Sequence, residues 1–402
     1  MLRLPIENTL DREEKIMAEW QTVRLGEIVK TNQSTYSPKE NWQFVNYLDT
    51  GNITMNKIDE IQNINTAKDK LPSRARRKVK TNSIIYSTVR PNQLHYGIIK
   101  KQPDNFLVST GFTVIDVNYD KAVPDFIYYA LTKQEVTEQL QAIAEQSVSA
   151  YPSLKPSDIE NLELMLPDKK TQERIVAILR SIDEKIKENN AINNNLEQQA
   201  QAIFKSWFID FEPFSNRKPS DWSASTLGNV SIMGAGGDKP QNVSPIKTDL
   251  YEYPIYSNGL SNEGLYGFTD KPKISEESVT VSARGTIGFV CLRHIPYVPI
   301  VRLVTLIPKT EIVSAKYLYL WLKQLHITGT GTTQQQLTVP DFQKTEILVP
   351  SQKIVTLFTA TVEPIFEKIW ANQNENEKLS SLRDTLLPKL MSGELDVSDI
   401  DL

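Results

Sequence analysis

Hydrophobic and polar positions form one pattern that occurs twice along the chain. In residues 21–165 and again in 222–349, short β-branched and aromatic runs alternate with Asn, Pro and Gly, which is typical of strands joined by turns. The clearest of these runs are 83–89 and 111–117 in the first stretch and 278–282 and 301–307 in the second. Each stretch also contains a helical segment, near 124–146 and 314–326. The pattern predicts two mixed domains of ordinary size.

The spacing changes after Pro167, where residues 168–208 contain neither Gly nor Pro and apolar positions recur at steps of three and four. This heptad spacing predicts a long helix packed against another. Its seam consists of Leu179, Ile182, Ile186, Asn189, Asn193, Leu196, Ala200, Ile203 and Trp207. A matching seam in the second half consists of Val362, Ile365, Ile369, Asn372, Asn376, Leu379, Arg383, Leu386 and Leu390. Pro364 predicts a kink or a new start there, and Asp168 and Ser351 stand at N-cap positions.

The middle of each seam carries two asparagines, Asn189 and Asn193 in the first and Asn372 and Asn376 in the second. One interpretation is that these heptads are weak and solvated. The other is that buried Asn side chains fix the register of the pair, as they do in coiled coils. An antiparallel pairing about a pseudo-twofold axis would bring the two midpoints together and send the domains to opposite ends.

Direct sequence matches indicate an internal duplication. The segment Trp20–Gly26 returns 202 residues later as Trp222–Gly228, and Leu154–Asp158 returns 183 residues later as Leu337–Asp341. Several such matches in one order are the signature of a repeat. We therefore expect an α+β (mixed α/β) fold, with two similar globular domains joined by two long helices that form an antiparallel coiled coil, a pseudo-twofold internal repeat.

A helix of about 40 residues is about 60 Å long. Two similar modules held at a fixed separation suit a ligand with two spaced sites, and twofold proteins read DNA half-sites about 34–36 Å apart. Because the modules differ in sequence, the two half-sites would differ as well. The helices would then set the length of a spacer that is not read.

The net charge of the chain does not suggest a nucleic-acid partner, but the distribution of its charged residues does. The formal net charge is −4, but residues 68–101 hold ten basic residues against one acid, and acidic residues gather near both ends of the chain. Lys and Arg neutralise phosphates, while Arg, Asn and Gln read base edges. The candidates in this module are Arg74, Arg76, Arg77, Lys78, Lys80, Arg90, Asn92, Gln93, His95 and Tyr96. The alternative is a solvated basic surface without a partner.

The second module is less concentrated in basic residues. Its candidates for binding DNA are Lys239, Lys271, Lys273, Arg284, Arg293, Thr333, Gln334 and Gln336, and Arg302 is a further basic residue. Gln336 could pair with adenine, although a Gln run is more often a solvated loop.

Longer segments carry a resemblance to a known family. These are Leu154–Pro167, Gln172–Leu179, Ile203–Pro213, Gly331–Leu337 and Leu382–Leu395. Together they resemble the specificity subunits of type I restriction–modification systems, the HsdS family, over nearly the whole chain. The second copy departs from the pattern at Ser351–Ile354, where the Gln172–Glu173 pair of the first copy has no counterpart.

The resemblance implies a non-catalytic subunit that recognises a bipartite double-stranded DNA target through two target-recognition domains. It also implies partners: two methyltransferase (modification) subunits, which use S-adenosylmethionine to methylate adenine N6 and dock on the helices and termini, and two restriction subunits, which use ATP and Mg²⁺. In these terms the chain comprises an N-terminal arm and target-recognition domain 1 (1–167), a spacer helix (168–212), target-recognition domain 2 (213–350), and a second spacer helix with a C-terminal tail (351–402).

Catalytic signatures are not found in the sequence, which contains no phosphate-binding loop and no amino-methyltransferase motif. The three histidines are scattered, so we expect no metal site, and the single Cys291 in an apolar run reads as a buried residue in a reducing cytoplasm. The acidic N-terminus argues against a signal peptide, and no apolar run suits a membrane. Two alternatives stay open: a coiled-coil protein scaffold that binds no DNA, and the recognition half of a fused restriction–methylation enzyme.

Overall fold

A computed structural model describes residues 20–147, 151–329, 336–398 and 400. The chain divides into two compact units. Unit 1 takes Met1–Lys187 together with Glu375–Leu402, and unit 2 takes the continuous segment Glu188–Asn374. Each long helix therefore contributes one part to each unit, and the two units are described in turn.

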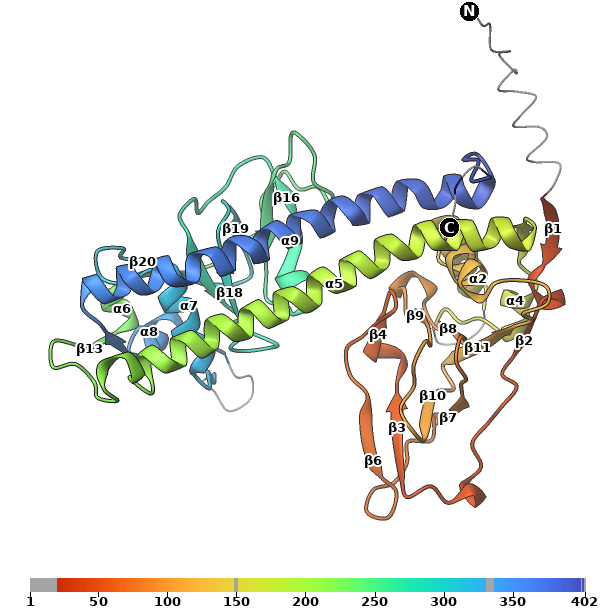
Figure 1. Cartoon of the computed structure of the whole chain (residues 1–402), viewed down its shortest axis with the longest axis horizontal. Helices are drawn as coiled ribbons and strands as arrows, with labels where there is room; N and C mark the ends of the chain where they lie inside the picture. The colour runs from red at the N-terminus through yellow and green to blue at the C-terminus, as the bar shows by residue number, and fades with distance from the viewer. Residues whose placement is uncertain (1–19, 148–150, 330–335, 399, 401–402) are drawn as a thin grey trace, which may run out of the picture. The chain divides into compact units, whose positions relative to one another are not determined.

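Unit 1 contains two four-stranded sheets. The first has the order β2 (Val29–Thr31), β11 (Phe112–Val117), β8 (Ile84–Ser87) and β9 (Tyr96–Ile98), and its neighbours are antiparallel. The second has the order β6 (Gln62–Asn65), β3 (Phe44–Leu48), β10 (Phe106–Ser109) and β7 (Ala75–Lys78), with β10 parallel to β3. Figure 1 shows this second sheet at the end of the domain that is remote from helix α5 (Lys169–Phe208).

Shorter elements complete unit 1. They are the antiparallel pair β1 (Gln21–Arg24) and β12 (Glu163–Leu166), the hairpin β4 (Ile53–Thr54) and β5 (Lys57–Ile58), and helices α2 (Pro124–Leu131), α3 (Gln134–Glu145) and α4 (Pro156–Glu160). Helix α2 is buried over nearly all its length and belongs to the same apolar core as Leu179 of α5. The second sheet has its own small core around Val45, Tyr47 and Leu107.

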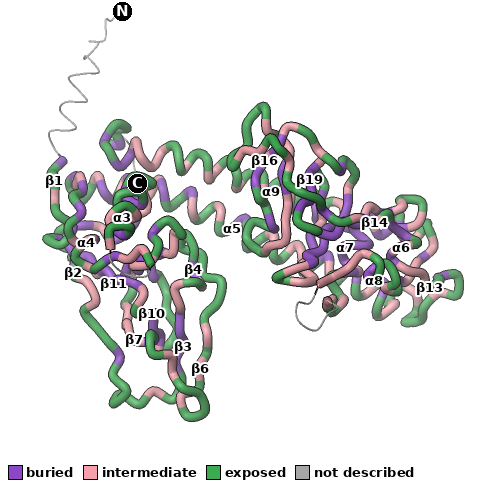
Figure 2. Tube along the Cα trace, turned by 180° about the vertical axis from the view of Figure 1, so that it is seen from behind, coloured by how far each residue is buried: buried purple, intermediate pink, exposed green. Residues whose placement is uncertain are grey.

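Unit 2 has a four-stranded sheet with the order β14 (Ser231–Ala235), β20 (Val304–Pro308), β17 (Ser278–Val281) and β18 (Val290–Arg293). A three-stranded sheet has the order β16 (Leu265–Thr269), β15 (Tyr253–Tyr256) and β19 (Val298–Pro299), with β15 parallel to β19. The antiparallel pair β13 (Ser223–Thr226) and β21 (Glu346–Val349) and helices α6 (Leu227–Val230), α7 (Ala315–Gln324) and α8 (Val339–Phe342) complete it. Helix α7 is buried along most of its length (Figure 2).

The two units repeat one topology, which confirms the predicted duplication. The pairs β1–β12 and β13–β21 correspond, as do the sheets β2–β11–β8–β9 and β14–β20–β17–β18. In the remaining sheets, β3 and β10 of unit 1 correspond to β15 and β19 of unit 2, and both pairs are parallel. Each domain also anchors itself to α5 through one tyrosine: Tyr129 donates to Asp183 in unit 1 (2.7 Å), and Tyr319 donates to Glu197 in unit 2 (2.6 Å).

The predicted long helices are α5 and α9 (Gln352–Ser392). Asp168 caps the first, since its side chain accepts hydrogen bonds from the backbone N–H groups of Lys170 and Thr171. Helix α9 continues without interruption through Pro364, so the expected new start at that residue was wrong.

The two helices run antiparallel within each unit, as expected. In unit 1, Lys185 lies 3.9 Å from Glu375, whereas Asp183, earlier in α5, meets Arg383, later in α9, at 3.1 Å. In unit 2, Asn193 contacts both Asn372 and the backbone carbonyl of Ile369. Asn189 and Asn372 are both buried, while Asn193 and Asn376 are partly exposed. The seam asparagines are therefore packed rather than fully solvated.

Candidate nucleic-acid interface

The basic cluster of unit 1 centres on β7, the last strand of the sheet remote from α5. Side chains alternate along a strand, so Arg76 and Lys78 project from one face and Arg77 from the other. Arg74, just before the strand, and Lys80, just after it, are exposed. This strand and the residues that flank it thus carry five of the predicted residues, on both faces of the sheet.

Local contacts distinguish these cations from one another. The ammonium of Lys78 pairs with Glu40 and lies 5.1 Å from the centre of the Trp42 ring. Lys80 has a looser ion pair with Asp116 at 3.6 Å. Partial burial lowers the pKa of the Arg77 guanidinium, and no described residue accepts a hydrogen bond from its Nε. Arg74 is exposed, and no carboxylate of the described residues lies within ion-pair distance of it.

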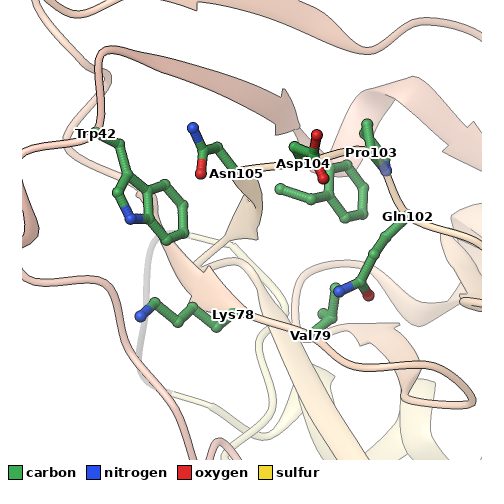
Figure 3. A pocket seen from close by; sticks show the side chains of 8 residues that line it. Trp42, Lys78, Val79, Gln102, Pro103, Asp104 and Asn105 are labelled. Carbon is green, nitrogen blue, oxygen red and sulfur yellow. The ribbon is translucent and has the colours of Figure 1, made fainter.

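A pocket of about 300 Å³ opens beside β7. Figure 3 shows Trp42 and Lys78 on one side of it and the segment that carries Asn105 on the other. Its lining consists of Trp42, Lys78, Val79 and Gln102–Phe106. The lining combines aromatic rings, one cation, two amide side chains and the carboxylate of Asp104. Cations contact phosphates, and amide and carboxylate side chains contact base edges.

The remaining candidates of unit 1 lie on the first sheet, in the connection between β8 and β9. Arg90, Asn92 and Gln93 are exposed there, and the Arg90 guanidinium stacks over Tyr151 at 5.1 Å. His95 is half-buried, with Nδ1 2.6 Å from the backbone oxygen of Ile53. The structure therefore distributes the predicted set over two sheets instead of one continuous strip.

In unit 2, Lys271 and Lys273 occupy the place of β7 in the repeat. Ile274 pairs antiparallel with Tyr297, the residue just before β19, and β7 pairs antiparallel with β10 in unit 1. Because β10 and β19 correspond, the two basic segments run along the same edge of the repeated sheet. Lys271 and Lys273 are exposed.

A second pocket, of about 460 Å³, lies next to this edge in unit 2. We call it the turn pocket; its lining consists of Gly236, Gly237, Asp238, Lys239, Tyr266, Arg284 and Ile300–Arg302. It brings together Lys239, Arg284 and Arg302, which are far apart in sequence. The Arg284 guanidinium donates to Oε1 of Gln336 (3.2 Å), so that predicted residue lies beside the pocket. Thr333 and Gln334 lie outside the described residues.

Two of the predicted DNA contacts are corrected by their burial. Tyr96 is 4% exposed and stacks on Tyr86 within the unit 1 core. Arg293 is 3% exposed, pairs with Glu263 at 2.9 Å and lies 3.6 Å from the centre of the Tyr256 ring. Both side chains hold the domain together and are not presented to a ligand.

Sequence reasoning did not identify Trp42, Asn105 or Tyr266 as site residues. Trp42 lies among polar residues just before β3, and an aromatic residue in a polar loop is a usable signal. Asn105 and Tyr266 carried no such signal, because they reach their pockets only through the pairing of distant strands.

The described parts of the chain hold no cluster of three or more His, Cys, Asp or Glu side chains suited to a metal ion. Among the helices in those same parts, none has the length and apolarity required to span a bilayer.

The two repeated domains coincide with matches to a family of known proteins. The model of the type I restriction modification DNA specificity domain matches residues 17–198 and 219–380, once in each half. The chain therefore belongs to this family of DNA specificity proteins.

Named relatives agree with that assignment. The chain is 29% identical to the type I restriction enzyme HindI specificity subunit of Haemophilus influenzae, over 94% of this chain and all of that protein. It is 26% identical to the MjaIX specificity subunit of Methanocaldococcus jannaschii, over 76% of each chain. The solved S subunit of a type I restriction–modification system from M. genitalium shares the fold, with a TM-score of 0.53, 18% identity and coverage of 97% of this chain and 98% of that one.

Proposed function

We propose that this chain recognises an asymmetric, two-part DNA sequence for a type I restriction–modification complex. Target-recognition domain 1 would read one half and target-recognition domain 2 the other, while α5 and α9 set the unread spacer. One observation carries this proposal: the same edge of the repeated sheet bears Arg74–Lys78 in unit 1 and Lys271–Lys273 in unit 2. Basic residues retained at one place, within domains that otherwise differ, fit contacts with the phosphate backbone.

The chemistry of the complex would reside in other subunits. In this proposal two methyltransferase subunits dock on the helices and termini and supply S-adenosylmethionine-dependent methylation of adenine N6. Two restriction subunits supply ATP- and Mg²⁺-dependent cleavage. This chain then acts without catalysing a reaction, in the cytoplasm where the DNA is.

Sequencing of methylated adenines tests the proposal directly. DNA would be taken from a host that expresses the chain with its methyltransferase subunits. The expected result is a motif with two defined halves separated by a spacer of constant length. A continuous motif would overturn the spacer role of the helices, and unmodified DNA from a host with all subunits present would overturn recognition itself.

Exchange of target-recognition domain 2 tests whether each domain reads one half of the motif. Replacing residues 213–350 with the same segment of a relative should change one half of the methylated motif and leave the other half and the spacer unchanged. A change in both halves would contradict the assignment of one half-site to each domain.

A further inference from the structure

The turn between β19 and β20 of unit 2 has an unfavourable backbone. Leu303 N–H donates to the carbonyl of Ile300 at 3.1 Å, which closes a four-residue turn. Both central residues are left-handed, with φ of 52° at Val301 and 61° at Arg302. This is the pattern of a type I′ turn, in which Asn-Gly is strongly preferred because its φ angles are positive. A β-branched Val in that region is a true outlier.

Unit 1 shows that the repeated fold does not require this conformation. The corresponding connection, between β10 and β11, runs from Ser109 to Phe112, and neither of its central residues has a positive φ. The positive φ angles of the turn between β19 and β20 therefore have no counterpart in the equivalent connection of unit 1. Retained strain of this kind is found where ligands are held.

Backbone hydrogen bonds to Gly236 and Gly237 hold the strained turn in place. Val301 N–H donates to Gly237 O and Arg302 N–H to Gly236 O, each at 2.8 Å. A Cβ on Gly236 would stand 2.7 Å from the backbone N and O of Ile300, so only glycine allows this close approach. The turn thus becomes a rigid wall of the turn pocket.

Positive charge converges on that wall. Lys239, Arg284 and Arg302 line the pocket, and the ammonium of Lys273 lies 3.9 Å from where a Cβ would stand on Gly237. Within the described ranges no carboxylate pairs with these four cations, and Asp238 is the one acid in the lining.

One of these cations, Arg284, has a hydrogen-bond donor that no described residue satisfies. The Nε of Arg284 is buried without a hydrogen-bond partner among the described residues. Burial of an unpaired donor is unfavourable, and an incoming anion would relieve it.

We propose that the turn pocket binds a backbone phosphate of DNA, with the strained turn holding Arg302 against it. This inference rests on the proposed function and places one of its contacts. A phosphate suits this lining because Lys239, Arg284 and Arg302 present several cations to one small space, and Lys and Arg neutralise phosphates. Tyr266, half-exposed at the rim, offers a flat face to the adjoining sugar.

Stability and DNA binding should respond in opposite directions to Arg302→Gly. The substitution supplies the residue that the turn prefers, so the melting temperature of the full chain should rise. With its methyltransferase subunits present, the complex should bind duplex DNA about tenfold more weakly at any sequence, because a charge-assisted contact is lost. The slope of log affinity against log salt should fall by about one.

Three further variants separate strain from charge. Val301→Asn relieves strain but keeps Arg302, so it should raise the melting temperature and leave DNA affinity unchanged. Arg302→Gln keeps the strain and should lose affinity as Arg302→Gly does. Lys309→Gln removes a cation that follows the opposite end of β20, where its ammonium donates to the backbone of Asn229, and should leave DNA affinity and the salt slope unchanged.

The outcomes distinguish this inference from the proposed function. Unchanged affinity and salt slope in both Arg302 variants, in a complex that still binds DNA, would overturn the phosphate site alone. A changed methylation motif would also overturn it, since a phosphate contact carries no sequence information. A wild-type complex without salt-dependent DNA binding would overturn the proposed function as well.

Discussion

The side-chain amide of Asn372 on α9 donates a hydrogen bond to the amide oxygen of Asn193 on α5, with 2.7 Å between Nδ2 and Oδ1. Asn193 in turn donates from its own Nδ2 to the carbonyl of Ile369 at 3.2 Å. Asn372 is only 1% exposed. The buried amide of Asn372 meets this partner in only one alignment of the two helices, so the bond specifies their register in unit 2.

Substitution of Asn372 alone should lower the free energy of unfolding more than substitution of both Asn193 and Asn372. Asn372→Leu leaves the Asn193 amide oxygen without this donor, and we expect a loss of about 1–3 kcal/mol in the free energy of unfolding. The double variant Asn193→Leu/Asn372→Leu should recover most of it, because two apolar side chains pack without an unmet hydrogen bond. Chemical denaturation of the wild type, Asn193→Leu, Asn372→Leu and the double variant gives the coupling energy, and additive effects would contradict a direct interaction.

A second prediction concerns Lys316, a cation of α7 that is 4% exposed in unit 2. Its ammonium lies 2.7 Å from Glu277 and 3.1 Å from Glu363 of α9, and so ties the domain to the helix. Glu277→Gln or Glu363→Gln alone should cost about 1 kcal/mol or less, because the other carboxylate remains and both are partly exposed.

The double variant Glu277→Gln/Glu363→Gln leaves Lys316 buried without a counter-charge. We expect a loss of about 3 kcal/mol or more, which exceeds the sum of the single losses. Denaturant titration of the full chain measures each value. Simple additivity would show that Lys316 does not depend on these two carboxylates together.

The helical part of the fold could be predicted because its signal is local. Leu179 and Val362 are fully buried in the structure, as the heptad spacing required. The side chain of Asp168 caps α5 where the preceding proline had marked its start. A run of residues at regular steps fixes which face of a helix is buried, whatever the rest of the chain does.

The interface was less predictable because basic character does not reveal which way a strand side chain points. Arg293 counted as a surface cation in the sequence, but its position on β18 turns it inward onto Tyr256 and Glu263. The turn pocket depends on Gly236 meeting Ile300 across the fold. Such contacts between distant segments leave no periodic trace in the sequence.

The single thiol of the chain should be unreactive in the folded protein. Cys291 lies on β18, and burial raises the pKa of its thiol to about 12. The group is therefore protonated at pH 8, whereas the nucleophile is the thiolate. A disulfide reagent such as DTNB at pH 8 should label the native chain very slowly and the denatured chain rapidly, with one thiol per chain. Rapid labelling of the native protein would show that β18 is open to solvent.

The last prediction tests whether the β7 edge contacts phosphates or bases. Arg74→Gln/Arg76→Gln removes two cations from this edge, and Gln retains polarity and much of the length. If both arginines neutralise phosphates, DNA affinity should fall at every sequence and the slope of log affinity against log salt should fall by about two. Lys121→Gln is the matched control, because Lys121 follows β11 on the other sheet and its ammonium donates to the backbone of Glu27. Binding titrations of the complex at several salt concentrations measure both quantities. An altered methylated motif with an unchanged salt slope would instead assign these arginines to base readout, since a base contact changes the preferred sequence and a phosphate contact does not.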